Sequence, residues 1–204
     1  MQMDRYSNFT ELDENEKKGE DYVIAYRKGS LDIAVMAIHG GGIEPGTADI
    51  ADAVAERTYT YYAFKGLKKK GNTILHLSSN TFDEPLGVRA AQEARIVLSI
   101  HGCRDEQEIV YVGGRDLELR QRFISSFRVS GFIAVASEVP GQRGIGENNI
   151  CNRCRNGKGV QLEISRGLRE KMYEDLERRL VRKRTPLLYT FVHCLKMSLA
   201  DAIP

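Results

Sequence analysis

The sequence predicts one α/β domain built on a mixed, mostly parallel sheet with helices on both faces. Strand-type segments alternate with helical segments of about ten to fifteen residues, which is the pattern of crossover units. The run 33–38 is continuously apolar, as expected of a strand that is covered on both faces. A chain of 204 residues with 42% hydrophobic residues fills one core and leaves no room for a second domain.

The first half of the chain begins with a polar lead-in over residues 1–19, and residues 20–204 form the folded domain. The segment 21–27 is rich in strand formers and is followed by a Lys-Gly-Ser turn signal, so we expect a hairpin with the strand that starts at Ile33. Thr47 is placed to cap a helix that continues to Arg57. The other expected elements are a short turn at 8–12, strands at 58–64, 73–77 and 95–101, and a helix at 84–94.

The second half continues the alternation and contains one long loop. The expected elements are strands at 108–113, 132–136 and 159–165 and helices at 116–128, 166–182 and 186–200. The helix over 166–182 is predicted from apolar residues that recur every four positions. The loop 138–158 is rich in glycine, asparagine and arginine. Loops of this length inside a domain are usually functional, so we expect this one to be a lid or a binding segment.

Two predicted strands end in the same way, with a histidine followed by a glycine. His39 precedes three glycines and Glu44, and His101 precedes a single glycine. In open α/β sheets ligands collect at the carboxyl ends of the strands, and the glycine turn lets Glu44 fold back toward His39. His39, Glu44 and His101 then form a His2Glu ligand set, which in catalytic zinc sites leaves a fourth position open for water. We expect one zinc ion per chain.

A single histidine of this kind is also explained as a strand end that hydrogen-bonds a neighbouring backbone. The pairing of His39 with His101, together with Glu44, favours the metal site. The two other histidines, His76 and His193, are expected to be structural, with His76 in the interior or at the rim of the site.

A late strand carries a polar face. Gln161 and Glu163 alternate with apolar residues over 159–165, which indicates a strand that borders a water-filled site. Glu163 is therefore the candidate general base. Arg153 and Arg166 are candidates for holding a substrate carboxylate in a bidentate fork or for stabilising the oxyanion. The predicted reaction is amide hydrolysis on an acidic substrate.

Charge and hydropathy exclude several classes of partner. The net charge of +2 gives no bulk argument for binding to nucleic acid or to a membrane. No run approaches the roughly 18 apolar residues of a membrane span, and the start of the chain lacks the apolar region of an export signal. We expect a cytoplasmic monomer. The one basic cluster, 178–184, suits the dipole at the end of a helix, and nucleic-acid binding there is the alternative function.

Four cysteines are too few for a disulfide scaffold in a chain of this size. Cys151 and Cys154 form a CxxC pair without a second pair to complete a zinc site and without the strand-to-helix context of a redox motif. We expect structural thiols.

The glycines after His39 also match the HGGG loop that forms the oxyanion hole of some α/β-hydrolases. That fold requires a Gly-x-Ser-x-Gly elbow, and no serine in the chain has glycine two positions away on both sides. This excludes the esterase reading.

Four motifs together resemble the poly-gamma-glutamate hydrolase family of bacilli and their phages, some members of which are labelled phage-related replication proteins. The motifs are HGGGIEPGT at 39–47, SIHG at 99–102, NICNR at 149–153 and GVQLEIS at 159–165. The resemblance covers roughly residues 20–200 in order and spacing.

The resemblance implies a fold similar to the zinc carboxypeptidases, with zinc on His39, Glu44 and His101 and with Glu163 as general base. It also implies that Asn152 and Arg153 bind substrate carboxylates, as an asparagine-arginine pair does in carboxypeptidases. The implied substrate is a gamma-linked glutamate polymer, and release by lysis is one route by which the protein would meet it. The runner-up function is a nucleic-acid-binding accessory of phage replication without hydrolase activity.

Overall fold

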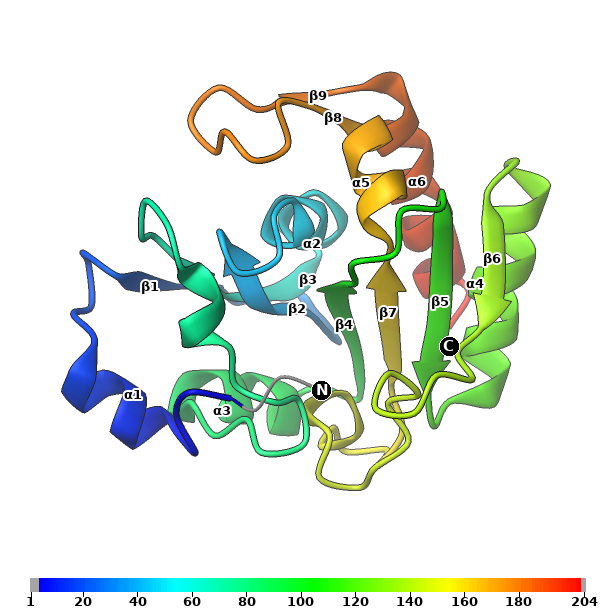
Figure 1. Cartoon of the computed structure of the whole chain (residues 1–204). Helices are drawn as coiled ribbons and strands as arrows, with labels where there is room; N and C mark the ends of the chain where they lie inside the picture. The colour runs from blue at the N-terminus through cyan, green and yellow to red at the C-terminus, as the bar shows by residue number, and fades with distance from the viewer. Residues whose placement is uncertain (1–3, 203–204) are drawn as a thin grey trace.

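The computed structural model describes residues 4–202, and its centre is a seven-stranded mixed sheet with helices on both faces (Figure 1). The strands are β1 (Tyr22–Arg27), β2 (Leu31–Gly41), β3 (Tyr59–Gly66), β4 (Ile96–Gly102), β5 (Ile109–Gly114), β6 (Ile133–Ala136) and β7 (Val160–Ile164). Their order across the sheet is β1-β3-β2-β4-β7-β5-β6. Within this sheet the β1/β3 and β5/β7 pairs are antiparallel and the other pairs are parallel. The predicted fold class is therefore confirmed.

The helices form a layer on each face of the sheet. They are α1 (Phe9–Asn15), α2 (Thr47–Ala55), α3 (Pro85–Glu93), α4 (Leu117–Val129), α5 (Arg166–Met172) and α6 (Pro186–Ala200). One core cluster joins the sheet to α2, α4, α5 and α6, and a second joins it to α1 and α3. Strand β2 serves both clusters, because Val35 and Ala37 belong to the first while Met36 and Ile38 belong to the second. Its continuous apolar run thus results from burial on both faces.

The predicted hairpin at the start of the domain is wrong. Strand β1 pairs with β3, with Tyr22 opposite Gly66, and β3 lies between β1 and β2. The turn at Gly29 instead carries the chain across the start of β3, where a Cβ on Gly29 would lie 2.2 Å from the carbonyl carbon of Tyr59. Strands β2 and β3 are joined as a parallel pair by the crossover through α2.

Two further elements differ from the prediction. The expected strand at 73–77 is a 3-10 helix, η1 (Asn72–Leu75), followed by extended chain. The expected helix over 166–182 ends at Met172, and the chain continues into β8 (Tyr173–Glu174), an excursion over 175–182, and β9 (Lys183–Arg184). The four-residue spacing was misleading there, because Leu176 is buried whereas Leu180 is 93% exposed. The basic cluster therefore does not lie at a helix end.

The N-terminal segment contributes to the core. Helix α1 is longer than the turn expected at 8–12, and its Leu12 is fully buried in the second core cluster with Tyr6. The Tyr6 hydroxyl donates to Glu16 Oε1 at 2.7 Å, and Lys68 Nζ lies 2.6 Å from Glu16 Oε2. Within residues 4–202, no helix has both the length and the hydropathy needed to cross a membrane.

The burial of Leu12 predicts that α1 stabilises the whole domain. Leu12→Ala removes a fully buried side chain and should lower the free energy of unfolding by about 2 to 5 kcal/mol. The matched control is Leu117→Ala, since Leu117 is 71% exposed and its truncation should change stability by less than about 0.5 kcal/mol. Urea denaturation of both variants makes the comparison. Equal stability of the two variants would mean that α1 is not part of the core.

A candidate metal centre at the ends of two strands

The loop after β2 brings Glu44 back to His39. Gly41 has a φ of 68°, and a Cβ there would lie 2.3 Å from the carbonyl oxygen of Gly66, so the turn requires glycine. The backbone N–H of Glu44 donates to the carbonyl of His39 at 2.8 Å. As a result Glu44 Oε1 lies 3.0 Å from His39 Nδ1.

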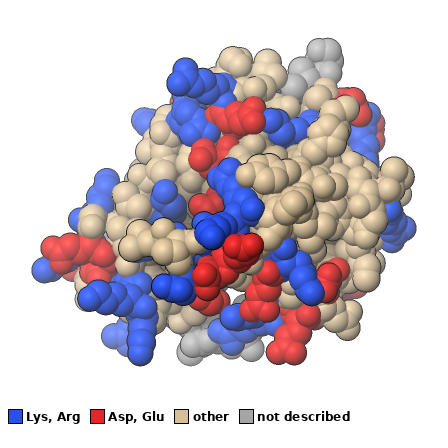
Figure 2. All heavy atoms as spheres, turned by 90° about the horizontal axis from the view of Figure 1, so that it is seen from above, with Lys and Arg blue, Asp and Glu red and all other residues tan. Residues whose placement is uncertain are grey.

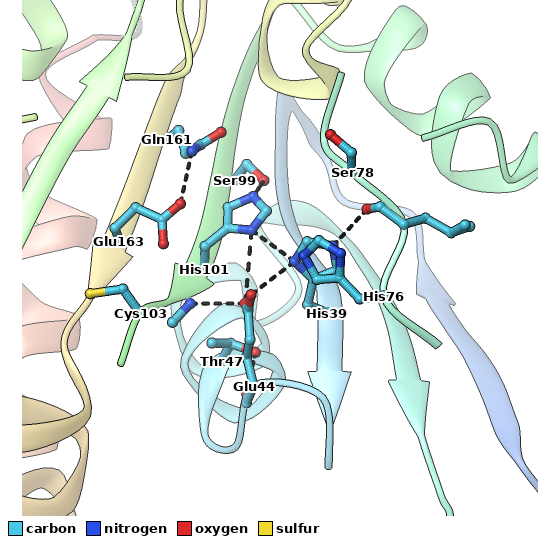
Figure 3. Close-up of polar contacts among 12 residues, drawn as sticks. His39, Glu44, Thr47, His76, Ser78, Ser99, His101, Cys103, Gln161 and Glu163 are labelled. Carbon is cyan, nitrogen blue, oxygen red and sulfur yellow. Dashed lines mark hydrogen bonds and ion pairs between the residues drawn. The ribbon is translucent and has the colours of Figure 1, made fainter. Parts of the chain in front are cut away.

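His101 completes the group from the neighbouring parallel strand β4. Its Nδ1 lies 3.1 Å from His39 Nδ1 and 3.8 Å from Glu44 Oε2. The N–H of Gly102 donates to Glu44 Oε2 at 2.8 Å and fixes the carboxylate (Figure 3). The ligand atoms of His39, Glu44 and His101 all lie within 4.8 Å of one another. The structure thus brings together the three side chains predicted as metal ligands.

The second nitrogen of each imidazole is held by the protein. His39 Nε2 donates to the carbonyl of Leu77 at 2.7 Å, and His101 Nε2 lies 2.8 Å from Ser99 Oγ. A carbonyl only accepts, so Nε2 of His39 carries the hydrogen and its Nδ1 presents a lone pair when the ring is neutral. Hydrogen bonds of this kind orient histidine ligands in metal sites.

This donor set fits a small divalent cation. Two imidazole nitrogens and a carboxylate face one another, and with neutral rings the lone pairs of His39 Nδ1 and Glu44 converge with no hydrogen between them. Such an arrangement is stabilised by a positive charge at its centre, either a proton or a metal ion. Two histidines and one glutamate are a ligand set of catalytic zinc.

The protonation states of Glu44 and His101 favour cation binding, whereas the carboxylate of Glu44 favours a proton on His39. Burial opposes ionisation of Glu44, but the neighbouring His39 outweighs it and, with His101 and the N–H of Gly102, lowers the pKa of Glu44 to about 2. Burial lowers the pKa of His101 to about 3, so this ring is neutral. Burial also acts to lower the pKa of His39, yet the charge of Glu44 reverses the effect and raises it. An ionised carboxylate and a neutral imidazole are the forms that bind metal.

Glu163 lies on the strand beside His101. In the pairing of β4 with β7, Glu163 is directly opposite His101. Its Oε1 accepts a hydrogen bond from Gln161 Nε2 at 2.9 Å, and Gln161 Oε1 accepts from Asn149 Nδ2 at 3.0 Å. All three residues are buried. Burial, together with the charge of Glu44, raises the pKa of Glu163 well above its ordinary value.

His76 and Asp4 border the same centre. The ring of His76 stacks on His39 with 3.9 Å between centroids, and its Nδ1 lies 2.6 Å from Asp4 Oδ1. The other oxygen of Asp4 accepts from the N–H of Ser78 at 2.6 Å. The His76 side chain is 37% exposed, so it forms part of the rim. The rim was one of the two positions predicted for it, the other being the interior. Asp4 comes from the N-terminal lead-in and carries no pattern that marks it in the sequence.

Arg169 stabilises the backbone around the metal centre, a role that the sequence did not predict. Its buried guanidinium donates to the carbonyls of Pro45, Cys103 and Ile164 at 2.8, 2.9 and 3.1 Å. A Cβ on Gly102 would lie 2.6 Å from its Cζ, so the guanidinium packs directly on that glycine. Arg169 lies on the buried face of α5 beside Leu168 and Met172, a position that the four-residue spacing of the apolar residues does not mark in the sequence.

The three candidate substrate-binding residues have other partners in this structure. Asn152 donates to the carbonyls of Gly144 and Gly146 and accepts from the N–H of Gly159. Both arginines are also engaged within the protein. Arg153 donates to the carbonyls of Asn148, Phe82 and Asn80, and Arg166 pairs with Glu170 and Glu177. A role in substrate binding stays a prediction for all three.

The CxxC cysteines are buried free thiols, with Cys151 inside η2 (Ile150–Asn152) and Cys154 just after it.

The chain resembles known proteins over almost its full length. The family model for poly-gamma-glutamate hydrolase matches residues 6–194. YndL of Bacillus subtilis (strain 168) is 36% identical over 171 residues, which cover 83% of this chain and 67% of YndL.

Two solved structures show the same fold. A bacteriophage poly-gamma-glutamate hydrolase has a TM-score of 0.93 and 32% identity, with 98% of each chain covered. A zinc-free apo structure of YndL has a TM-score of 0.90 and 32% identity, with 99% of this chain and 100% of that chain covered. The matched family model, the curated relative and the shared fold lead to one conclusion: this chain belongs to the poly-gamma-glutamate hydrolase family.

Proposed function

We propose that the protein is a zinc-dependent amidohydrolase that cleaves gamma-glutamyl amide bonds of poly-gamma-glutamate. The observation that carries this proposal is the convergence of His39 Nδ1, His101 Nδ1 and the Glu44 carboxylate beside the buried carboxyl group of Glu163. Membership of the hydrolase family supports the substrate, and the zinc-free state named for YndL supports the metal.

In the proposed mechanism His39, Glu44 and His101 would hold the zinc ion. Zinc in such a site supplies a Lewis acid for the amide carbonyl and lowers the pKa of water toward about 7. The protein residues do the remaining work. Leu77 and Ser99 keep both imidazoles oriented through their Nε2 atoms, and Gly102 keeps the carboxylate of Glu44 in place.

Glu163 moves the proton. Gln161 occupies its Oε1, which leaves Oε2 to accept a proton from the attacking water and to pass it to the leaving nitrogen. The raised pKa of Glu163 suits this exchange, because a general base works best when its pKa lies near the working pH. Arg153, Asn152 and Arg166 are proposed to bind substrate carboxylates. Arg153 and Asn152 must then release their backbone partners, and Arg166 must release Glu170 and Glu177.

The nucleic-acid alternative gains no support from these similarities. Its basic cluster is also largely engaged, since Arg178, Arg182 and Lys183 lie within 4 Å of acidic groups. We therefore favour the hydrolase.

The first prediction concerns the metal. Purified protein should contain one zinc ion per chain, and a chelator should remove the zinc and the hydrolysis of poly-gamma-glutamate together. His101→Ala should lose most of the bound zinc because it removes one of three protein ligands. His193→Ala is the matched control, since His193 is exposed on α6. Metal analysis that finds full zinc occupancy in His101→Ala would refute the ligand assignment.

The second prediction separates the base from the ligands. Glu163→Gln should keep its zinc but lose turnover by about 10²- to 10⁴-fold, the usual contribution of a general base. Glu147→Gln, at an 84% exposed side chain, should behave as the unsubstituted protein. Zinc content and polymer sizing make the test. Unchanged turnover in Glu163→Gln would mean that another group takes the proton.

The third prediction concerns the orientation of Glu163. Gln161→Met removes a hydrogen bond that lowers the pKa of Glu163, so that pKa should rise further. A base must be ionised to act, so the acidic limb of the pH–rate profile should move to higher pH while the zinc content stays constant. An unshifted acidic limb would show that Gln161 does not tune the base.

A further inference from the structure

A charged cavity lies beside the loop that carries Glu44. It has a volume of about 300 Å³ and lies between the excursion over 175–182 and the ends of β2 and β3. Its lining includes Gly41, Asp49, Lys65, Arg179 and Arg182. Neither the zinc ligands nor Glu163 line it. Three of its four charged side chains are cations, so the cavity is positive.

Charges of both signs lie on this face. Figure 2 shows the molecule from the side of the β8/β9 excursion, where Lys and Arg side chains lie beside Asp and Glu side chains. In the cavity, Arg182 Nη1 pairs with Asp49 Oδ2 at 2.6 Å, and the guanidinium lies over the Tyr173 ring at 5.4 Å from its centroid. The Arg182 side chain is only 5% exposed, so this pair is fixed and its charges cancel.

Two cations in the cavity have no carboxylate partner among residues 4–202. The Lys65 ammonium forms no ion pair there, and Arg179 donates only to the carbonyls of Gly66 and Leu67, at 3.0 and 3.4 Å. Neutral carbonyl oxygens satisfy hydrogen bonds but do not neutralise a guanidinium. A net charge of about +2 therefore remains in one concave site, where low-dielectric walls strengthen its field.

The cavity and the metal centre share one backbone segment. A Cβ on Gly40, the residue after His39, would lie 3.0 Å from Lys65 Cγ, so the stem of Lys65 crosses that glycine. The carbonyl of Gly66 accepts from Arg179 and also from the N–H of Gly42, at 3.0 Å in each case. The loop that directs Glu44 to the metal centre thus packs against the stem of Lys65 and shares the carbonyl of Gly66 with Arg179.

We propose that this cavity is a carboxylate subsite that binds a free carboxylate of the polymer at a position away from the cleaved bond. This inference rests on the proposed function. A gamma-linked glutamate chain carries one free alpha-carboxylate per residue, so a segment that passes the metal centre presents further anions at regular intervals. Charged hydrogen bonds from Lys65 and Arg179 would match such a group, and 300 Å³ is the size of a small-ligand pocket.

The test measures binding without turnover. A fluorescently labelled gamma-linked glutamate decamer is titrated into the zinc-loaded Glu163→Gln protein, and anisotropy is followed at several salt concentrations. Adding Lys65→Met should weaken binding about tenfold and make its salt dependence shallower, because one charged contact is lost while the stem over Gly40 remains. Lys65→Arg should retain most of the affinity.

Lys28→Met is the matched control. Lys28 lies in the turn before β2, at the opposite end of that strand, and pairs with Glu93, so its loss should leave affinity unchanged. With Glu163 present, Lys65→Met should raise the KM for the polymer and leave the hydrolysis of a gamma-glutamyl dipeptide unaltered. Thermal unfolding of each variant confirms that the fold is kept.

Two results would overturn the subsite. One is equal decamer affinity in the Lys65→Met and parent proteins. The other is displacement of the labelled decamer by a single-stranded DNA decamer as effectively as by unlabelled gamma-glutamate, which would make the cavity a general polyanion surface. Failure of the proposed function would look different from both results. The unsubstituted protein would then not cleave the polymer, although decamer binding would still be weakened by Lys65→Met.

Discussion

The carboxylate of Glu44, whose side chain is 14% exposed, is the group on which the rest of the site depends. Removing an ionised carboxylate from water costs several kcal/mol unless neighbouring groups compensate it. Here His39, His101 and the N–H of Gly102 surround it, and together they hold its pKa at about 2 despite its burial. Glu44 and the two imidazoles are also the groups required to bind a divalent cation. Stability of the loop and readiness for metal thus come from one arrangement.

Much of the remaining fold keeps that arrangement in place. Arg169 binds the carbonyl of Pro45, and the Tyr173 hydroxyl donates to the carbonyl of Gly46 at 3.1 Å, so both ends of the α5–β8 junction hold the loop. A Cβ on Gly46 would lie 2.9 Å from the Tyr173 ring. The early end of α5 is therefore connected to the site, since a longer helix would carry Tyr173 away from the loop. The excursion that follows then closes the cationic cavity beside the same loop.

The sequence was sufficient to predict those features that local residue patterns and sheet topology determine together. The apolar run of β2 and the repeated His-Gly ends predicted the sheet and the convergence of His39 with His101, because parallel strands end at one edge. The partner of β1 was not predictable from the turn at Gly29, because β3, which comes later in the chain, pairs with β2 and lies between β2 and β1. Long-range contacts also explain what was missed: Asp4 reaches His76 across 72 residues, and Arg169 reaches Pro45 across 124. Neither pair leaves a periodic signal.

The central claim is that both imidazoles bind zinc through Nδ1 while their Nε2 atoms stay bonded to Leu77 and Ser99. A crystal structure of the zinc-loaded protein, with anomalous data collected at the zinc edge, tests this directly. The account predicts one strong peak per chain, between Nδ1 of His39, Nδ1 of His101 and the carboxylate of Glu44. A peak elsewhere, contact through an Nε2 atom, or no peak in protein shown to contain zinc would contradict it.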